Sequence, residues 1–275
     1  MLELPEALVI AGQINEVLGG RRLTEVEAGH TPHGFAFYQG DPALYPQLLE
    51  GLTLDRAEQA GGLVELCLGD MRLTLGDGVN VRYVPPDGKK PERHQLWLGF
   101  EGGGALCCTV QMYGGMMAFP AGKNDNFYYL VTKEKPSPLS QAFDEAYFGG
   151  LWESCKPTTS AKAFLATEQR IPGLGNGCLQ DILFRAGVHP KRKLETMGEN
   201  ERVALFHAVK DTLAEMAEQG GRDTEKDLFG QSGRYQTYLS AKTWKGVCPV
   251  CSGSITRQAY LGGNVYFCGN CQPLA

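Results

Sequence analysis

The sequence predicts an α+β protein of several domains: an N-terminal β-sandwich with an opening helix, a helical domain, and a C-terminal zinc-ribbon hairpin. Three observations lead to this prediction. Short apolar runs separated by turn residues fill positions 22–133, the apolar spacing becomes helical from about residue 140, and four cysteines lie in two pairs near the end. A chain of 275 residues can hold more than one hydrophobic core.

The opening stretch MLELPEALVI predicts a helix that begins near Pro5. Two carboxylates, Glu3 and Glu6, lie at its start, beside the terminal amine. An α-amine has a reference pKa of about 7.7–8.0, and the positive end of a helix disfavours its protonated form. Such an amine can attack a sugar C1′ and form a Schiff base, with Glu3 as proton donor or acceptor. Most N-termini beside helices are inert, so this pattern needs support from elsewhere in the chain.

The next segment reads as β structure, and we assign residues 1–132 to one domain. The expected strands are 63–68, 80–84, 96–100, 105–113 and 127–132. The turn signals between them are GDG, PPDG and EGGG, a pattern typical of a β-sandwich or barrel. The stretch KEKPSPL marks a linker at 133–140, because its prolines block regular structure.

Helical spacing then predicts a domain over 141–240. Ser160 can cap a helix with the sequence SAKAFLATEQ, and Asn176 can cap the next helix, which Gly187 would end. A further amphipathic helix is expected over 205–216.

The stretch IPGLGNGCLQDILFRAGVHP contains a possible anion site. Gly173 and Gly175 let the backbone approach a partner closely, and the N–H groups at the start of the Asn176 helix favour a phosphate. Lys162 on the preceding helix could meet the same phosphate. The alternative is a corner between two helices in which the glycines serve packing alone.

The cysteine quartet is the strongest signal for a metal. CPVC and CGNC place two C-x2-C turns sixteen residues apart, which suits a hairpin over 241–275. Four thiolates complete a tetrahedral shell, so we expect one structural zinc ion bound by Cys248, Cys251, Cys268 and Cys271. A redox pair or an iron–sulfur cluster is the alternative. The remaining cysteines are expected to be small buried hydrophobes.

Composition limits the partners and the compartment. The net charge is −5 and the pI is near 5.6, which argues mildly against a large basic surface for nucleic acid. No apolar run is long enough for a membrane span, and the N-terminus lacks the pattern of a signal peptide. We therefore expect a cytoplasmic monomer with no membrane partner.

Taken together, the ELPE helix, the β domain, the GLGNGCLQDILFRAGVHP stretch and the spaced cysteines resemble the formamidopyrimidine-DNA glycosylase and endonuclease VIII family over the whole chain. The resemblance implies a helix-two-turns-helix domain, DNA held in the cleft between two domains, and a damaged base flipped out of the duplex. It also implies base excision with cleavage of the resulting abasic site. Carried across, residue 2 takes the nucleophile's position, Glu3 and Glu6 the catalytic and helix carboxylates' positions, and Lys162 and Asn176 the phosphate contacts.

Several positions depart from the family pattern. Members usually begin Met-Pro-Glu, and their proline amine is exposed once Met is removed, whereas this chain has Leu2, whose bulk hinders that removal. The family's catalytic lysine falls at Gly62, its arginine–phenylalanine pair near Tyr113 and Gly114, and its phosphate-gripping arginine at Gly263. These changes support an alternative: a non-catalytic DNA-binding homologue that keeps the fold and the zinc. A scaffold that binds RNA or protein through the hairpin is a third reading.

Two segments and two histidines each allow two interpretations. The aromatic run at 31–45 is either core or a platform for base stacking, and the GGRDTEKDLFG stretch at 220–230 is either a solvated loop or a lining near the flipped base. His33 and His94 are each either structural or part of a site.

Overall fold

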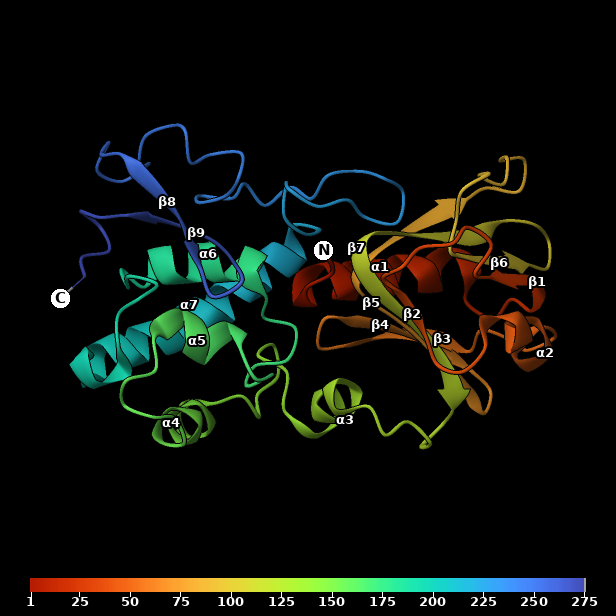
Figure 1. Ribbon diagram of the computed structural model, residues 1–275, viewed down its shortest axis with the longest axis horizontal. Coiled ribbons are helices and arrows are strands. Elements are labelled where there is room, and N and C mark those ends of the chain that lie inside the picture. Colours follow the sequence, from red (N-terminus) through yellow and green to blue (C-terminus); the bar gives the residue numbers. More distant parts are fainter. Residues whose placement is uncertain (275) are drawn as a thin grey trace. The chain divides into compact units, whose positions relative to one another are not determined.

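The structure is a computed structural model that describes residues 1–274, and it contains two compact units (Figure 1). The first unit comprises Met1–Leu130 together with Glu225–Ser232, and the second comprises Val131–Thr224 and the chain from Gly233 onward. Helix, sheet, helical domain and cysteine hairpin follow in the predicted order, so the predicted fold class is confirmed. The domain boundaries stay a prediction; the compact units differ from them by placing 225–232 with the first unit.

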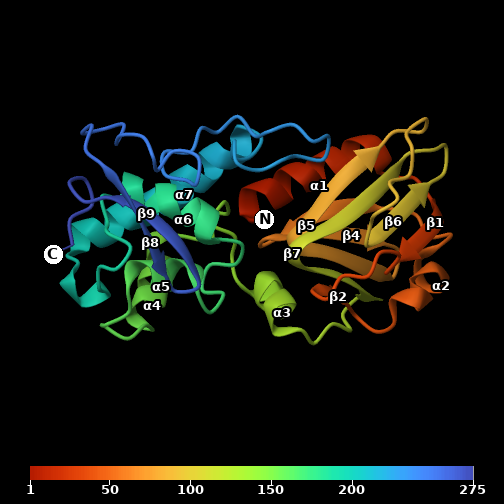
Figure 2. The ribbon, with the colours of Figure 1, turned by 45° about the horizontal axis from the view of Figure 1, so that its top comes forward.

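Helix α1, Leu4–Leu18, opens the first unit close to the predicted start. Glu3 is its N-cap, Pro5 lies in its first turn, and Gly19 ends it. One side of the helix is buried against the sheet, next to β3 and β4 (Figure 2). The side chain of Asn15 fixes this packing, because it both donates to and accepts from the backbone of Ala57 in β3.

Seven strands form one connected sheet in the order β1-β6-β7-β5-β4-β3, with β2 paired in parallel to β7. Their bounds are β1 Leu23–Ala28, β2 Ala36–Tyr38, β3 Arg56–Ala60, β4 Leu63–Leu68, β5 Met71–Val84, β6 Leu96–Phe100 and β7 Ala105–Pro120. The long strands β5 and β7 run through both halves of the sheet: β7 pairs with β6 in its first half and with β2 in its second half. The register of β5 against β7 shifts between Asp77 and Val79, and such a bulge bends the paired strands.

Short helices interrupt the segment that was predicted to be entirely β. Residues Pro42–Leu44 form a 3-10 turn (η1) and Tyr45–Leu49 form α2. The strand predicted at 127–132 is wrong, because Phe127–Glu134 is helix α3. The Asn126 side chain accepts from the N–H of Tyr128, and this local cap outweighs the β preference of the aromatic residues.

The second unit holds α4 Glu145–Glu153, α5 Ala161–Ala166, α6 Asn176–Arg185, a 3-10 turn η2 at Leu194–Thr196, and α7 Glu199–Glu218. The predicted cap at Ser160 is confirmed, since its hydroxyl accepts from the N–H of Ala163 at 3.2 Å. The predicted cap at Asn176 is wrong by one residue: Gly175 is the N-cap and Asn176 is the first helical residue. A core of stacked and edge-on aromatic rings joins these helices: Phe143, Phe148, Phe164 and Phe206.

A two-stranded hairpin, β8 Ile255–Tyr260 and β9 Gly263–Cys268, completes the second unit. It is fixed to α6, because the Gln180 side chain accepts from the N–H of Tyr266 at 3.0 Å and donates to the carbonyl of Asn264. Within residues 1–274, no helix is both long enough and apolar enough to span a membrane.

Candidate functional site

The start of α1 brings an amine and two carboxylates into one small region of the first unit. The N–H of Leu2 donates to the carbonyl of Asp77 at 2.7 Å, which ties the chain end to the bulge in β5. Asp77 has a φ of +57°, so the backbone is strained at this contact. Glu3 and Glu6, each 4% exposed, lie in the first turns of the helix that follows.

Burial of these two carboxylates is costly unless they are partnered, and neither lacks a partner. The helix N-terminus also favours negative charge at this position. The structure therefore places the predicted carboxylates Glu3 and Glu6 next to the chain end that carries residue 2. Their catalytic role stays a prediction.

The segment Glu225–Ser232 packs against this same region, which sequence reasoning did not anticipate. The Met1 amine lies 2.5 Å from the Glu225 carboxylate. Asp227 accepts from the Gln13 side chain at 2.8 Å, and Leu228 is fully buried in the core of the first unit. An apolar leucine within a charged run was the signal for this docking.

Strand β7 presents two large apolar side chains close to the bulge. Met112 is 64% exposed and Tyr113 is 40% exposed. Gly114 pairs with Asp77, and a Cβ on Gly114 would lie 2.7 Å from the Val79 side chain, so this position excludes any side chain. Tyr113 and its neighbour Met112, which the sequence reasoning did not single out, are thus the available apolar groups here.

Position 62 offers no functional side chain. Gly62 lies in the tight turn between β3 and β4, after Gly61 with a φ of +59°. A family lysine aligned with this glycine therefore has no replacement at the same position.

In the second unit, α5, α6 and the tip of the hairpin meet. The Lys162 ammonium donates to the carbonyl of Tyr260 at 2.6 Å, and the Asn176 amide donates to the carbonyl of Asn264 at 2.9 Å. Lys162 is only 3% exposed, and this burial lowers its pKa. Lys162 therefore stabilises the hairpin tip in this structure, and its contact with a phosphate stays a prediction.

The glycines of this region have distinct conformations. Gly173 has a φ of +83°, which L side chains rarely adopt, and Gly175 is the extended N-cap of α6. Gly263 begins β9 with an ordinary strand backbone, and a Cβ there would lie 3.4 Å from the Asn176 amide nitrogen. The oxygen of that amide is buried and has no hydrogen-bond partner. A side chain at position 263 would thus begin in contact with the Asn176 amide.

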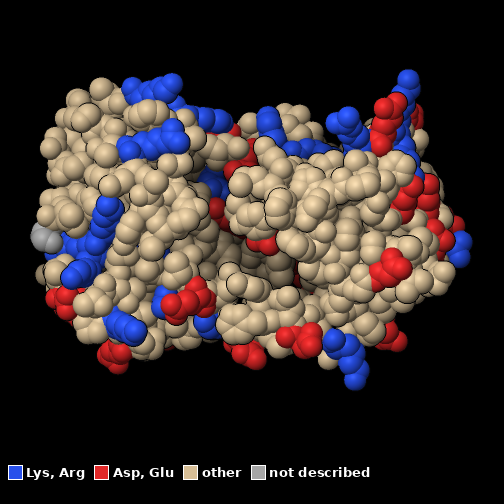
Figure 3. Space-filling view, in the orientation of Figure 1, with Lys and Arg blue, Asp and Glu red and all other residues tan. Residues whose placement is uncertain are grey.

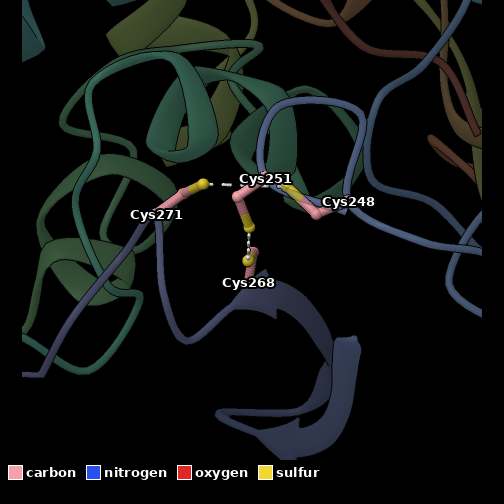
Figure 4. Close-up of side chains that lie close together, drawn as sticks. All are labelled: Cys248, Cys251, Cys268 and Cys271. Atoms are coloured by element: carbon pink, nitrogen blue, oxygen red, sulfur yellow. Dashed lines mark hydrogen bonds between the residues drawn. The ribbon is translucent and has the colours of Figure 1, made fainter. Parts of the chain in front are cut away.

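The four cysteines of the quartet converge at the base of the hairpin (Figure 4). Sγ of Cys251 lies 3.4 Å from Sγ of Cys268, and Sγ of Cys248 lies 3.7 Å from Sγ of Cys271. The N–H of Gly253, followed by the neighbouring thiols, lowers the pKa of Cys251 to about 6, which favours a thiolate. Four sulfur atoms at these distances can bind one tetrahedral metal ion.

Charge is unevenly distributed over the surface. On the face drawn in Figure 3, Lys and Arg side chains are spread over the second unit, whereas large areas of the first unit carry no charge. The net negative charge of the chain is therefore not spread evenly over this face.

Comparisons with known proteins agree with this geometry. The family model for the formamidopyrimidine-DNA glycosylase H2TH domain matches residues 135–227. The chain is 26% identical over 284 residues to a formamidopyrimidine-DNA glycosylase of Shouchella clausii, with 99% of each chain covered. It is also 33% identical over 149 residues to the enzyme of that name from Thermus thermophilus, covering 52% of this chain and 55% of that one.

Solved structures extend the likeness to the whole fold. The crystal structure of the MutM (Fpg) protein from Thermus thermophilus matches with a TM-score of 0.82 and 25% identity, covering 99% of both chains. The Lactococcus lactis Fpg bound to DNA with an abasic site has the same fold, with a TM-score of 0.85 at 22% identity and with 98% of this chain and 99% of that chain covered. Architecture, cysteine quartet, domain match and full-length similarity lead to one conclusion: the chain contains a formamidopyrimidine-DNA glycosylase H2TH domain and is similar over its whole length to formamidopyrimidine-DNA glycosylases.

Proposed function

We propose that this protein is a DNA repair glycosylase that excises a damaged base and cleaves the abasic site through a Schiff base on its N-terminal amine. The observation that carries the proposal is the start of α1, where the chain end and the buried carboxylates Glu3 and Glu6 lie together. Full-length similarity to proteins named formamidopyrimidine-DNA glycosylase supports it. The partner is DNA that contains a damaged base or an abasic site.

In this mechanism the amine nitrogen forms a bond to the sugar C1′ while the bond from C1′ to the base breaks, and the departing base takes up a proton. Loss of the proton from the amine and opening of the sugar ring then give the Schiff base. Glu3 donates or accepts the protons of these steps, because it is the carboxylate next to the terminus. The Schiff base makes a C2′ proton acidic, and its removal expels the 3′ phosphate.

Two amines can carry this chemistry, in two environments. If Met1 stays, its nitrogen is the one that pairs with Glu225; if Met1 is removed, the nitrogen of Leu2 is the one held by the Asp77 carbonyl. The Glu225 carboxylate pairs directly with the Met1 amine, whereas the nitrogen of Leu2 is the one next to Glu3 in the chain. We therefore assign the nucleophile to the nitrogen of Leu2.

DNA binding is assigned to the second unit and to β7. We propose that Gly173, Gly175, Asn176 and Lys162 hold a backbone phosphate at the start of α6, where N–H groups and the helix dipole favour an anion. Met112 and Tyr113 supply the exposed apolar groups that can occupy the space left by a flipped base.

The quartet is proposed to hold one structural zinc ion. Four thiols fill a tetrahedral shell and leave no position for a reacting water, so the ion would stabilise the hairpin without taking part in catalysis. The reducing conditions of the cytoplasm, where we place the protein, keep such thiols available.

A second candidate is a non-catalytic DNA-binding homologue. The observation that favours it is Leu2: if its bulk keeps Met1 in place, the nitrogen of Leu2 is a peptide amide and cannot react, and the Met1 amine pairs with Glu225. Gly62 and Gly263, which lack the side chains of the family, agree with it.

Borohydride trapping separates the two candidates. Purified protein is incubated with duplexes carrying an abasic site or an oxidised base, reduced, and digested for mass spectrometry of the N-terminal peptide. A covalent adduct on that peptide is the expected result, and the same spectrum identifies its first residue. DNA binding without an adduct and without strand cleavage would refute catalysis and favour the second candidate.

Two variants with a matched control sharpen this test. Glu3→Gln is expected to abolish the adduct, whereas Glu16→Gln, on an exposed position of the same helix, should keep it. Leu2→Pro should increase the adduct, because the smaller second residue allows removal of Met1 and exposes a secondary amine. Full activity in Glu3→Gln would remove the role assigned to that carboxylate.

A further inference from the structure

Three side chains that the proposed function does not use come together at one end of the β1–β6 strand pair. Glu27 lies near the end of β1, His30 follows two residues after this strand, and His94 precedes β6. Glu27 pairs with Trp97 across the two strands, so the histidines flank one carboxylate. Their possible ligand atoms all lie within 4.8 Å of one another.

The distances suit ligands of a common ion. Nε2 of His94 lies 3.0 Å from one carboxylate oxygen of Glu27, and Nδ1 of His30 lies 2.8 Å from the other. Around a tetrahedral ion with metal–ligand distances of about 2.0–2.1 Å, two ligand atoms are about 3.3–3.4 Å apart, only a few tenths of an ångström more than these atoms are here. The two imidazole rings are stacked in parallel, with centroids 4.4 Å apart, and both meet the same carboxylate.

The contacts of His94 direct its Nε2 toward Glu27. His94 is 1% exposed, and its Nδ1 lies 2.9 Å from the Pro91 carbonyl, which can only accept, so Nδ1 carries a hydrogen. Nε2 then faces an oxygen of Glu27, which is also an acceptor. A metal ion placed between Nε2 and this oxygen would have both atoms as ligands. A backbone carbonyl that fixes the far nitrogen of the ring is typical of metal-binding histidines.

Lys90 shows that Glu27 already attracts cations. Its ammonium lies 2.6 Å from Glu27 and 2.9 Å from Glu25, and this contact holds the pKa of Glu27 at about 2. Because Lys90 has a flexible side chain and a second carboxylate partner, it can leave Glu27 while staying paired with Glu25. Lys90 is thus the cation that competes with a metal.

We propose that Glu27, His30 and His94 form a second metal site, separate from the cysteine quartet, that binds a divalent transition ion such as Zn2+. Imidazole and carboxylate donors suit such ions, and water completes the shell. Binding uses the lone pairs of Nε2 of His94 and Nδ1 of His30, with any hydrogen on these atoms released to solvent, and it frees Lys90 to pair with Glu25 alone. The bound ion links the segment before β6 to the edge strand β1.

The test counts zinc in the full-length protein after dialysis against buffered micromolar free zinc, using elemental mass spectrometry. Two ions per chain are expected, one in each site. His30→Ala and Glu27→Gln should each leave one ion, while His207→Ala, at an exposed histidine outside the cluster, should keep two. Cys251→Ser, at an exposed position of the quartet, should also leave one ion per chain, because it removes the quartet site and keeps the site of Glu27, His30 and His94.

Two results would overturn the proposal: one ion per chain in the unaltered protein, or two ions in His30→Ala. The His30 side chain is largely at the surface, so this variant is expected to fold even where a change at buried His94 disturbs the core. Lys90→Gln should bind the second ion several-fold more tightly, and unchanged affinity would contradict competition by the ammonium. None of these readouts depends on DNA repair activity.

Discussion

Restoring an arginine at position 263 should strengthen DNA binding. The backbone of Gly263 has an ordinary strand conformation, and the added Cβ would contact Asn176 at 3.4 Å, so the first side-chain atom of Gly263→Arg meets no severe clash. The guanidinium would extend from the hairpin tip beside Asn176 and Lys162, where we place a phosphate. A hydrogen bond to a charged group contributes about 1.5 kcal/mol, which corresponds to roughly tenfold in affinity.

Salt dependence distinguishes a phosphate contact from a general effect. Each added phosphate contact steepens the plot of log affinity against log salt by about 0.9, so the advantage of Gly263→Arg should shrink about 3.5-fold between about 50 and 200 mM salt. Fluorescence anisotropy with a labelled abasic-site duplex measures both quantities. Gly263→Ala is the control for the added Cβ and should leave affinity and salt slope unchanged.

Two results would refute this reasoning. An unchanged salt slope in Gly263→Arg would mean that the hairpin tip does not face a phosphate. If the alanine and arginine variants both lose affinity, DNA binding requires that no side chain stands beside Asn176. The phosphate site assigned to α6 would then be incorrect.

Two further predictions concern the second unit. Removal of the metal by a chelator, or the variant Cys251→Ser, should make the hairpin sensitive to protease and weaken DNA binding. Because Cys251 is exposed, this effect would come from loss of the metal and not from lost packing. Cys155→Ser, outside the quartet, is the control. Asp181 is fully buried, and desolvation raises its pKa to about 6, above the unfolded value of about 3.9. The contribution of Asp181 to the free energy of unfolding is therefore full below the unfolded pKa and is lost as pH rises through the folded pKa. Urea unfolding measures this loss by comparison with Asp181→Asn. The stability of the unaltered protein relative to this variant should fall by about 1 kcal/mol between about pH 5 and 7.5. A difference that does not change with pH would contradict this account.

The parts of the fold that follow from local patterns could be predicted from the sequence. The runs at 63–68 and 96–100 are strands β4 and β6, and Gly187 follows the end of α6 with a φ of +67°. The quartet was predictable because two C-x2-C turns encode their own geometry. Helix α3 was missed because its aromatic residues favour strands, and because Asn126, which accepts from the N–H groups of Tyr128 and Tyr129, was not recognised as a cap.

The features that depend on distant contacts could not be predicted. The burial of Lys162 depends on the carbonyl of Tyr260, a partner far along the chain. The Glu27–His30–His94 cluster likewise requires the pairing of β1 with β6, which no periodicity reveals. For the same reason the ion pair between Met1 and Glu225 was not foreseen.

The docking of Glu225–Ser232 also affects how the protein is made. Leu228 completes the core of the first unit, yet it is synthesised after most of the second unit. A growing chain that has just left the ribosome with residues 1–130 therefore has an unfilled space where Leu228 belongs, and it exposes apolar surface until residue 232 emerges. We expect this half-made protein to depend on chaperones, and any change that delays the return of the chain to the first unit should lower the yield of folded protein before it affects repair.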